Sequence, residues 1–285
     1  MSVETINLSH IYGKDTVFET AALSDVSFSV EDGEFIGIIG QTGSGKCTLI
    51  QHLNRLIQPT SVTVLLDGED INAKGVKMKD ICSRVGLVFQ YPEYQLFEET
   101  VYKDIAFGPT NMGIEDVDGA VREAMKLVRL DFDRFAEKSP FELSGGQKRR
   151  VALAGVLAMN PEVLILDEPA SGLDPLGRKE ILDNIKSLHE KKNLTIFLVS
   201  HSMTDVCEYA SRIMVFSEGR LEMFDTPEKI FAHSDELEQM GLTVPDGKKL
   251  MMKLRDRGLD VNTDVYTFEG ALEEIRRTRR EKDNA

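Results

Sequence analysis

Cysteine and tryptophan are scarce in this sequence. Its 285 residues include three cysteines, Cys47, Cys82 and Cys207, and no tryptophan. The cysteines are odd in number and widely spaced, with no CxxC pair and no Cys/His cluster, so neither a disulfide framework nor a zinc site is indicated. We therefore expect a protein of the reducing cytosol.

Excess positive charge and long apolar runs are also missing. The formal net charge is −14 at pH 7, which argues against a general nucleic-acid-binding protein, because such proteins usually carry a basic footprint. The stretch "IRRTRREK" near the C-terminus is interpreted as a solvated helix end. No apolar run approaches the roughly 20 residues of a membrane-spanning helix, and the first residues show no signal-peptide pattern. If the protein works at a membrane, we expect another chain to supply the span.

What the sequence does contain is a succession of short apolar runs separated by turns. Period-two patterning predicts strands in "TINLSHIY", "LSDVSFSVEDGEFIGIIG", "SVTVLLDGEDI" and "RVGLVFQ". A helix is predicted over residues 46–57 and is expected to end at Pro59. From about residue 92 to 160 the pattern becomes mostly helical.

The second half of the sequence returns to strands. The continuous apolar runs "VLILDE" and "TIFLVS" suit a parallel sheet that is buried on both faces. Asp174 and Pro175 predict the start of a helix between these runs. "IMVFSEGRLEMFD" predicts a hairpin, and Thr226 with Pro227 predicts a further helix. The pattern favours an α/β domain over residues 1–230, with a small appendage over 231–285.

The stretch "GQTGSGKCT" follows the buried strand "EFIGIIG" and leads into a helix. This is the context that a phosphate-binding loop requires. Its glycines let backbone N–H groups turn toward phosphates, the helix N-terminus adds positive potential, and Lys46 supplies a point charge. The residues predicted to bind ATP here are Gly40, Gln41, Thr42, Gly43, Ser44, Gly45, Lys46, Cys47 and Thr48.

An acidic pair ends the run "VLILDEP", about 120 residues after the glycine loop. A carboxylate at the end of a buried strand can hold Mg²⁺, which is the role predicted for Asp167. Glu168 can orient and deprotonate an attacking water molecule. Together with the glycine loop, the pair predicts an ATP-hydrolysing enzyme.

A second anion-binding helix end is predicted at "LSGGQKRR". A serine and two glycines at the start of a helix expose backbone N–H groups. One chain that holds one ATP has no need for two such helix ends, so the second is expected to close over ATP bound to another subunit. The residues concerned are Ser144, Gly145, Gly146 and Gln147.

The motifs "GQTGSGK", "LSGGQ", "LILDEP", "SGLDP" and "VSH", in this order, resemble the nucleotide-binding domain of ABC transporters over roughly residues 3–230. The resemblance implies a P-loop NTPase core of ABC type, with a β-subdomain and a helical subdomain at about 92–160. It implies that Gln90 touches Mg²⁺ and senses a transmembrane partner, and that Asp174 signals between the two sites of a dimer. His201 would contact the γ-phosphate and Tyr12 would stack on adenine.

A narrower resemblance comes from "FQYPEYQLFEETVYKDIAFGP", residues 89–109. It is similar to the ATPase subunits of energy-coupling factor transporters, which import vitamins and metal ions, and in particular to the second of two paralogous ATPases. The resemblance implies a peripheral protein at the cytoplasmic face of the cell membrane. Its expected partners are a second ATPase subunit (a paralogue or a second copy), a transmembrane coupling subunit and a substrate-binding membrane subunit, with no nucleic acid.

Three positions depart from the family pattern. Val62 stands where a turn glycine is common, and Ala170 with Ser171 varies a usual Thr-Ala pair. Cys47 replaces the hydroxyl that commonly binds Mg²⁺, and a neutral thiol is a poor ligand for this hard ion. ATP binding is expected to survive this change, while Mg²⁺ placement and turnover are in doubt.

Three functions remain open on the sequence alone. The first is a transport ATPase that drives a separate membrane subunit. The second is an ABC-type ATPase acting on DNA or ribosomes, but such proteins usually join two cassettes or carry long coiled-coil insertions, and neither is seen. The third is a subunit that binds ATP but hydrolyses it poorly, which Cys47 favours and the intact Glu168 and His201 oppose.

Overall fold

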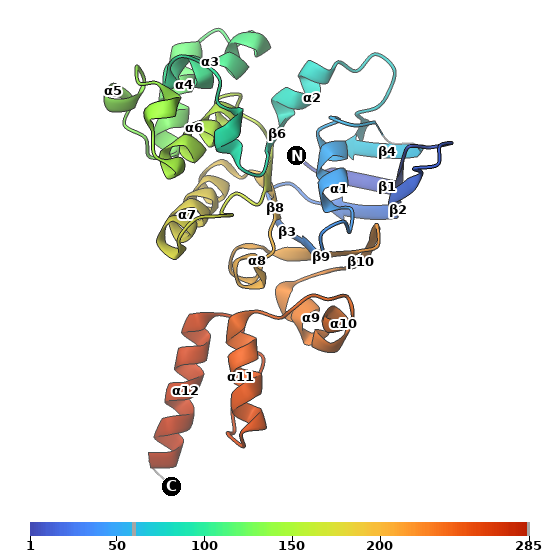
Figure 1. Cartoon of the computed structure of the whole chain (residues 1–285), viewed down its shortest axis with the longest axis vertical. Coiled ribbons are helices and arrows are strands. Elements are labelled where there is room, and N and C mark those ends of the chain that lie inside the picture. Colours follow the sequence, from blue (N-terminus) through green and yellow to red (C-terminus); the bar gives the residue numbers. More distant parts are fainter. Residues whose placement is uncertain (59–60, 284–285) are drawn as a thin grey trace. The chain divides into compact units, whose positions relative to one another are not determined.

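The structure is a computed structural model that describes residues 1–58 and 61–283. These residues form two compact units, one from residues 1–35 and 47–199, and the other from residues 36–46 and from residue 200 onward. Figure 1 labels the elements.

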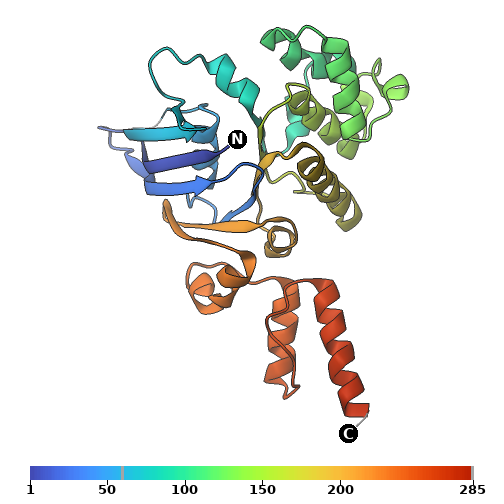
Figure 2. The ribbon, with the colours of Figure 1, turned by 180° about the vertical axis from the view of Figure 1, so that it is seen from behind.

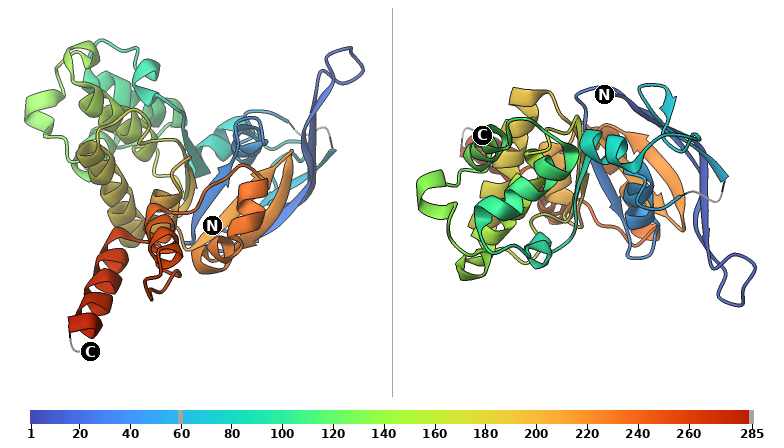
Figure 3. Two further views of the ribbon diagram at one scale, coloured as in Figure 1. Left: turned by 60° about the horizontal axis from the view of Figure 1, so that its bottom comes forward. Right: turned by 90° about the horizontal axis from the view of Figure 1, so that it is seen from above.

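The first unit contains an antiparallel sheet with strand order β2-β1-β4-β5. The strands are β1 (Val3–Tyr12), β2 (Thr20–Val30), β4 (Ser61–Leu66) and β5 (Glu69–Asp70). Along β1, buried and accessible side chains mostly alternate, as expected for a sheet with one packed face. The turn that joins β1 to β2 extends beyond the sheet (Figure 3).

The first unit also contains three parallel strands in the order β8-β7-β6. They are β6 (Val85–Val88), β7 (Val163–Asp167) and β8 (Thr195–Val199). Every residue of β7 and β8 is buried, which confirms the prediction from the apolar runs. Helix α7 (Pro175–Lys192) starts where predicted, because the Asp174 carboxylate accepts hydrogen bonds from the N–H groups of Leu176 and Gly177.

The helices of residues 78–157 complete the first unit. Figure 2 shows α3 to α6, in green to yellow-green, gathered away from the antiparallel sheet of the same unit. The helical character predicted from about residue 92 to 160 is therefore confirmed. The elements are α2 (Met78–Arg84), η1 (Pro92–Gln95), α3 (Val101–Met112), α4 (Val117–Leu127), α5 (Phe132–Phe135), η2 (Pro140–Glu142) and α6 (Gly145–Leu157).

The helix after the glycine loop is shorter than predicted. Helix α1 spans Lys46–Leu53, not residues 46–57. Arg55 has a φ of 59°, in the left-handed region that an α-helix cannot contain, and its guanidinium donates to the Val76 carbonyl at 2.8 Å. The turn at Arg55 therefore ends the helix, and Pro59, which was expected to end it, lies outside the described residues.

The second unit is built on the strand that carries the glycine loop. Strand β3 (Phe35–Gly40) pairs in parallel with β9 (Arg212–Ser217), which pairs antiparallel with β10 (Arg220–Asp225) as the predicted hairpin. Its helices are α8 (Met203–Tyr209), α9 (Pro227–Ala232), α10 (Ser234–Gln239), α11 (Asp246–Asp256) and α12 (Phe268–Asp283). Within the part of the chain that the structure describes, no helix combines the length and apolarity that a membrane span requires.

Helices α11 and α12 form a hairpin near the C-terminus (Figure 1). A small cluster of buried side chains, Met251, Val261 and Ala271, lies between them. Helix α12 keeps Phe268, Leu272 and Ile275 exposed, and the spacing of these three residues puts them on one helical face. The predicted boundary after residue 230 stays a prediction.

Candidate functional site

The glycine loop follows the fully buried strand β3. Gly43 and Gly45 have φ values of 82° and 102°, in the region that favours glycine. A Cβ on Gly40 would lie 2.4 Å from the Phe216 carbonyl oxygen and 2.5 Å from Ser44 Oγ, so no larger residue fits. The loop thus has the backbone shape of a phosphate cradle.

Lys46 closes this loop from within. Its Nζ donates to the carbonyl oxygens of Gly40 and Gln41, both at 2.8 Å, and the residue is 5% exposed. The ammonium is therefore held at the mouth of the cradle, where phosphate oxygens can compete with these carbonyls for its protons.

A residue far along the chain also supports the glycine loop. Gly241 has a φ of 66°, and a Cβ on it would lie 1.7 Å from the Gln41 amide nitrogen. The backbone between α10 and α11 therefore lies directly against the first side chain of the loop. Gly241 was not predicted from the sequence. The only available signal was that a glycine follows a predicted helix, as is common in turns.

The acidic pair lies at the carboxyl end of β7. Asp167 is the last strand residue and is 9% exposed. Glu168 has a φ of 48°, and its N–H donates to the Val199 carbonyl at 3.0 Å. A left-handed conformation at a non-glycine residue is sparsely populated and tends to occur at functional sites.

The structure brings Gln90 and Glu168 together. Gln90 follows β6, and its Nε2 donates to Glu168 Oε2 at 2.9 Å. Strands β6 and β7 are parallel neighbours, so their carboxyl ends meet at one edge of the sheet. The predicted water-activating residue and the predicted sensing residue are thus in direct contact.

The segment "LSGGQ" starts α6 with a reciprocal cap. Ser144 Oγ accepts from the Gln147 N–H at 3.4 Å, while Gln147 Oε1 accepts from the Ser144 N–H at 3.0 Å, which is a capping box. A Cβ on Gly145 or Gly146 would meet no atom within 4 Å. Packing within the chain therefore does not require these glycines, and the helix end is open to a ligand or another subunit.

Arg149 joins three parts of the site and was missed by sequence reasoning. It is 4% exposed, and its guanidinium donates to both carboxylate oxygens of Glu93 at 3.0 and 3.2 Å. It also donates to the carbonyls of Pro169 and Ser171 at 3.1 and 2.8 Å. No local sequence pattern marked Arg149, because its partners lie far from it along the chain.

The other predicted residues lie on separate elements. Asp174 caps α7, and His201 is exposed two residues beyond β8. Tyr12 is 43% exposed, and its hydroxyl lies 3.4 Å from Thr48 Oγ1. Cys47 is exposed and the side chain of Val62 is not described.

Two pairs of exposed aromatic side chains follow Gln90, and together we call them the exposed aromatic patch. They are Tyr91, Tyr94, Phe97 and Phe107, which are 42%, 85%, 58% and 48% exposed. The Phe97 and Phe107 rings meet edge to face with centroids 5.0 Å apart. The N–H of Phe97 donates to the Asp104 carboxylate at 3.0 Å, which fixes the segment to α3.

The residues predicted to bind ATP and Mg²⁺ are chemically suited to both, except for the Cys47 thiol. The described residues contain no group of three or more His, Cys, Asp and Glu side chains that could hold a metal. Mg²⁺ needs no such cage, because it is commonly bound by one or two carboxylates with substrate phosphates and water. Asp167 and Gln90 offer oxygen ligands, whereas the Cys47 thiol does not.

Comparison with known proteins defines the class. The sequence model of the ABC transporter family matches residues 23–171. The chain of cbiO1 from Clostridium perfringens, described as part of the ABC transporter complex cbiONQ, superposes with a TM-score of 0.73 at 33% identity, covering 83% of this chain and 93% of that one. The cassette MJ0796, dimeric and bound to ADP and Pi after hydrolysis, gives a TM-score of 0.69 at 28% identity, covering 79% and 98%. The fold is therefore that of an ABC-type ATPase.

A curated relative narrows the class further. "Energy-coupling factor transporter ATP-binding protein EcfA2" of Clostridium tetani (strain Massachusetts / E88) is 52% identical over 277 residues, which cover 96% of both chains. This chain belongs to the ABC transporter family and, within it, to the ATP-binding proteins of energy-coupling factor transporters. Both resemblances drawn from the sequence motifs are thus confirmed.

Proposed function

We propose that this chain binds ATP with Mg²⁺ at the glycine loop, hydrolyses it with Glu168, and drives the uptake of vitamins or metal ions through separate membrane subunits. It is the ATP-binding subunit of an energy-coupling factor transporter, paired with a second ATPase subunit. We place it at the cytoplasmic face of the membrane as a peripheral subunit. The helical part at about 92–160 receives the membrane partner, and residues 231–285 serve subunit contacts.

Each residue has a chemical task in this proposal. The loop amides of residues 40–45 and the Lys46 ammonium bind phosphate oxygens. Glu168 accepts the proton of the attacking water, and His201 contacts the γ-phosphate. Asp167 and Gln90 would hold Mg²⁺, which would supply positive charge to neutralise the phosphate oxygens. Tyr12 stacks on the adenine ring.

The partner subunit completes each site in the proposed dimer. The open N-terminus of α6 at Ser144, Gly145, Gly146 and Gln147 faces ATP held by the other chain and binds its phosphates through backbone N–H groups. Asp174, which caps α7, reports between the two sites. ATP thus closes the dimer, and hydrolysis with product release opens it.

The hydrogen bond between Gln90 and Glu168 is the observation that carries coupling to a membrane subunit. It joins the water-activating carboxylate to the segment that presents the exposed aromatic patch. A partner helix that docks on the patch and shifts this segment also shifts Glu168. Exposed aromatic clusters of this kind are enriched at protein interfaces.

The test is to substitute the patch and follow assembly and transport. Phe97→Asp in the full chain, co-expressed with its membrane subunits, should lower recovery of the detergent-solubilised complex and substrate uptake about tenfold or more, because truncated aromatic anchors commonly cost an interface over 1 kcal/mol. ATP binding by the purified chain should be unchanged. Phe18→Asp, on the turn between β1 and β2, is the matched control, since Phe18 is 82% exposed. Normal assembly of the Phe97 variant would remove the patch from the coupling surface.

A further inference from the structure

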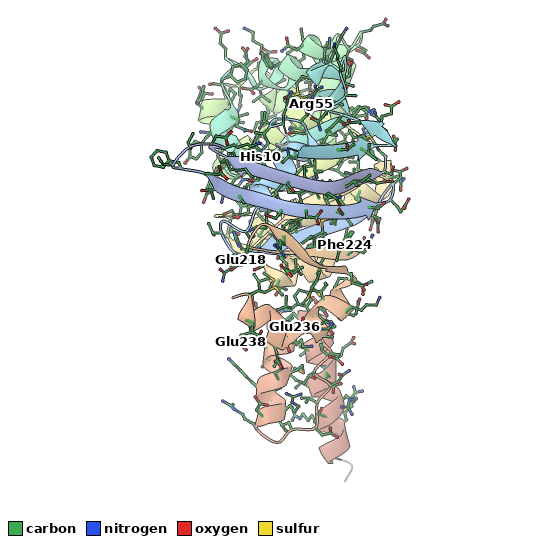
Figure 4. All side chains as sticks on the ribbon, turned by 90° about the vertical axis from the view of Figure 1, so that its right-hand side faces the viewer. His10, Arg55, Glu218, Phe224, Glu236 and Glu238 are labelled. Carbon is green, nitrogen blue, oxygen red and sulfur yellow. The ribbon has the colours of Figure 1, made fainter. Side chains whose placement is uncertain are left out.

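Two residues of β1 face two residues of α1 in the first unit. His10 and Tyr12 share one face of the strand because side chains alternate, and Thr48 and His52 are one helical turn apart. The His10 and His52 rings have centroids 4.8 Å apart, and the Tyr12 and Thr48 hydroxyls are 3.4 Å apart. Strand and helix are thus tied by two side-chain pairs, and Figure 4 marks His10 on its strand.

The two histidines are buried without normal hydrogen bonds. His10 is 9% and His52 is 1% exposed, and none of their four ring nitrogens has a hydrogen bond of normal geometry within the described chain. Burial lowers the pKa of both rings, that of His52 to about 4, while backbone hydrogen bonds outside normal geometry, at Gln58 for His10 and at Ile57 for His52, raise the pKa in part. Such weak pairing is uncommon for buried polar groups in native proteins.

The histidine pair supports the tyrosine from one side. The His10 ring meets the Tyr12 ring at a centroid distance of 4.4 Å and an interplanar angle of 75°. Tyr12 is 43% exposed, so the ring has buried contacts and also an accessible surface. The His10 ring and the Thr48 hydroxyl together fix where that surface lies.

We propose that His10 is a positioning residue for the nucleotide base, and that it acts by holding the Tyr12 ring in its stacking orientation. This inference rests on the proposed role of Tyr12 in binding adenine. A ring already fixed in place loses less conformational freedom when a base stacks on it. His10 therefore strengthens binding of the base and has no effect on binding of the phosphates, which the glycine loop performs.

The same geometry makes base binding sensitive to acid. Two titratable side chains pack against the His10 ring, His52 from α1 and Tyr12 from β1. The paired residue Leu23 of β2 carries no charge, and the contact at Gln58 is with uncharged backbone. Protonation of His10 places a charge in a buried site beside the His52 ring, and a buried charge favours exit to water. Protonation of His10 thus releases Tyr12, so affinity for the base is lost as the pH falls toward 5.

The experiment measures Mg²⁺-free binding of ATP and of inorganic tripolyphosphate to the full chain, by competition with a fluorescent ATP analogue. His10→Ala should weaken ATP binding about tenfold, the scale of one base–aromatic stack, and leave tripolyphosphate binding unchanged. His10→Phe, a flat ring that cannot titrate, should keep the affinity for ATP at pH 7.5 and remove its decline toward pH 5. His233→Ala, at an exposed histidine paired with Glu236, is the control and should match the wild type.

Tyr12→Ala separates this inference from the proposed function. If it leaves ATP affinity unchanged, the assigned role of Tyr12 is wrong. If it weakens ATP binding while His10→Ala does not, the base site stands and the role of His10 is wrong. An equal loss of ATP and tripolyphosphate binding in His10→Ala overturns the inference too, because it shows a general packing role. Support requires that the double variant binds ATP no more weakly than Tyr12→Ala.

Discussion

Replacing Arg149 by methionine should destabilise the protein far more than the same change at its neighbour Arg150. Arg149 and Glu93 side chains are 5% and 17% exposed. The substitution leaves the Glu93 carboxylate and the carbonyls of Pro169 and Ser171 without their donor. Breaking a buried ion pair by removing one partner costs about 3–5 kcal/mol, a large part of the roughly 5–15 kcal/mol that folding provides.

Arg150 supplies the matched control. It pairs with Glu180 at 2.8 Å, but these side chains are 27% and 49% exposed, and such surface pairs contribute about 0–1 kcal/mol. The assay is urea unfolding of each purified variant at pH 7.5, with the free energy of unfolding taken from the linear transition. Glu93→Gln combined with Arg149→Met should recover part of the loss, because no unpaired charge remains. Equal, small costs at the two arginines would refute the reasoning.

Three further outcomes are expected. Cys47→Ser should raise the Mg²⁺-dependent ATPase activity of the assembled transporter about tenfold, or roughly 1.4 kcal/mol of barrier, because it restores an oxygen ligand. An unchanged Mg²⁺ titration would show that the thiol has no effect on turnover. Ending the chain before Asp246 keeps Gly241 beside Gln41, so the truncated monomer should still bind ATP. Its dimerisation, measured by sedimentation, should weaken. Loss of ATP binding by a folded truncated monomer would contradict this. His52→Gln should abolish up to about 2 kcal/mol of the stability that the protein loses between pH 7.5 and 5, measured by urea unfolding. The reason is that the pKa of His52 is lowered from 6.5 to about 4 in the folded state, so folding becomes less favourable as the pH falls through that window. An unchanged pH slope of the unfolding free energy would contradict this.

Local sequence signals were sufficient for most elements. The buried strands β3, β7 and β8 follow from uninterrupted apolar runs, and Asp174 followed by Pro175 marks the start of α7. The glycine loop follows from spacing alone, because its conformations are ones that only glycine adopts readily. These features depend on neighbours in the sequence, so pattern and residue type predict them.

Features that depend on distant residues were not predictable in the same way. The end of α1 is set by the left-handed turn at Arg55, a residue type with no preference for that conformation. The Arg149–Glu93 pair and the contact of Gly241 with Gln41 join residues far apart along the chain. The histidine pair likewise needs the docking of α1 on β1. Only the folded backbone brings these groups together.

Binding and turnover of ATP by Glu168→Gln test the central claim most directly. The change keeps the side-chain shape and the proposed phosphate contacts but removes the base. The assembled transporter should therefore bind ATP with wild-type affinity. Its kcat should decrease at least about 100-fold, which is the lower end for loss of a general base. Glu190→Gln, at an exposed position of α7, is the control and should turn over normally. Near-normal turnover by the Glu168 variant would contradict the assignment of that carboxylate to water activation.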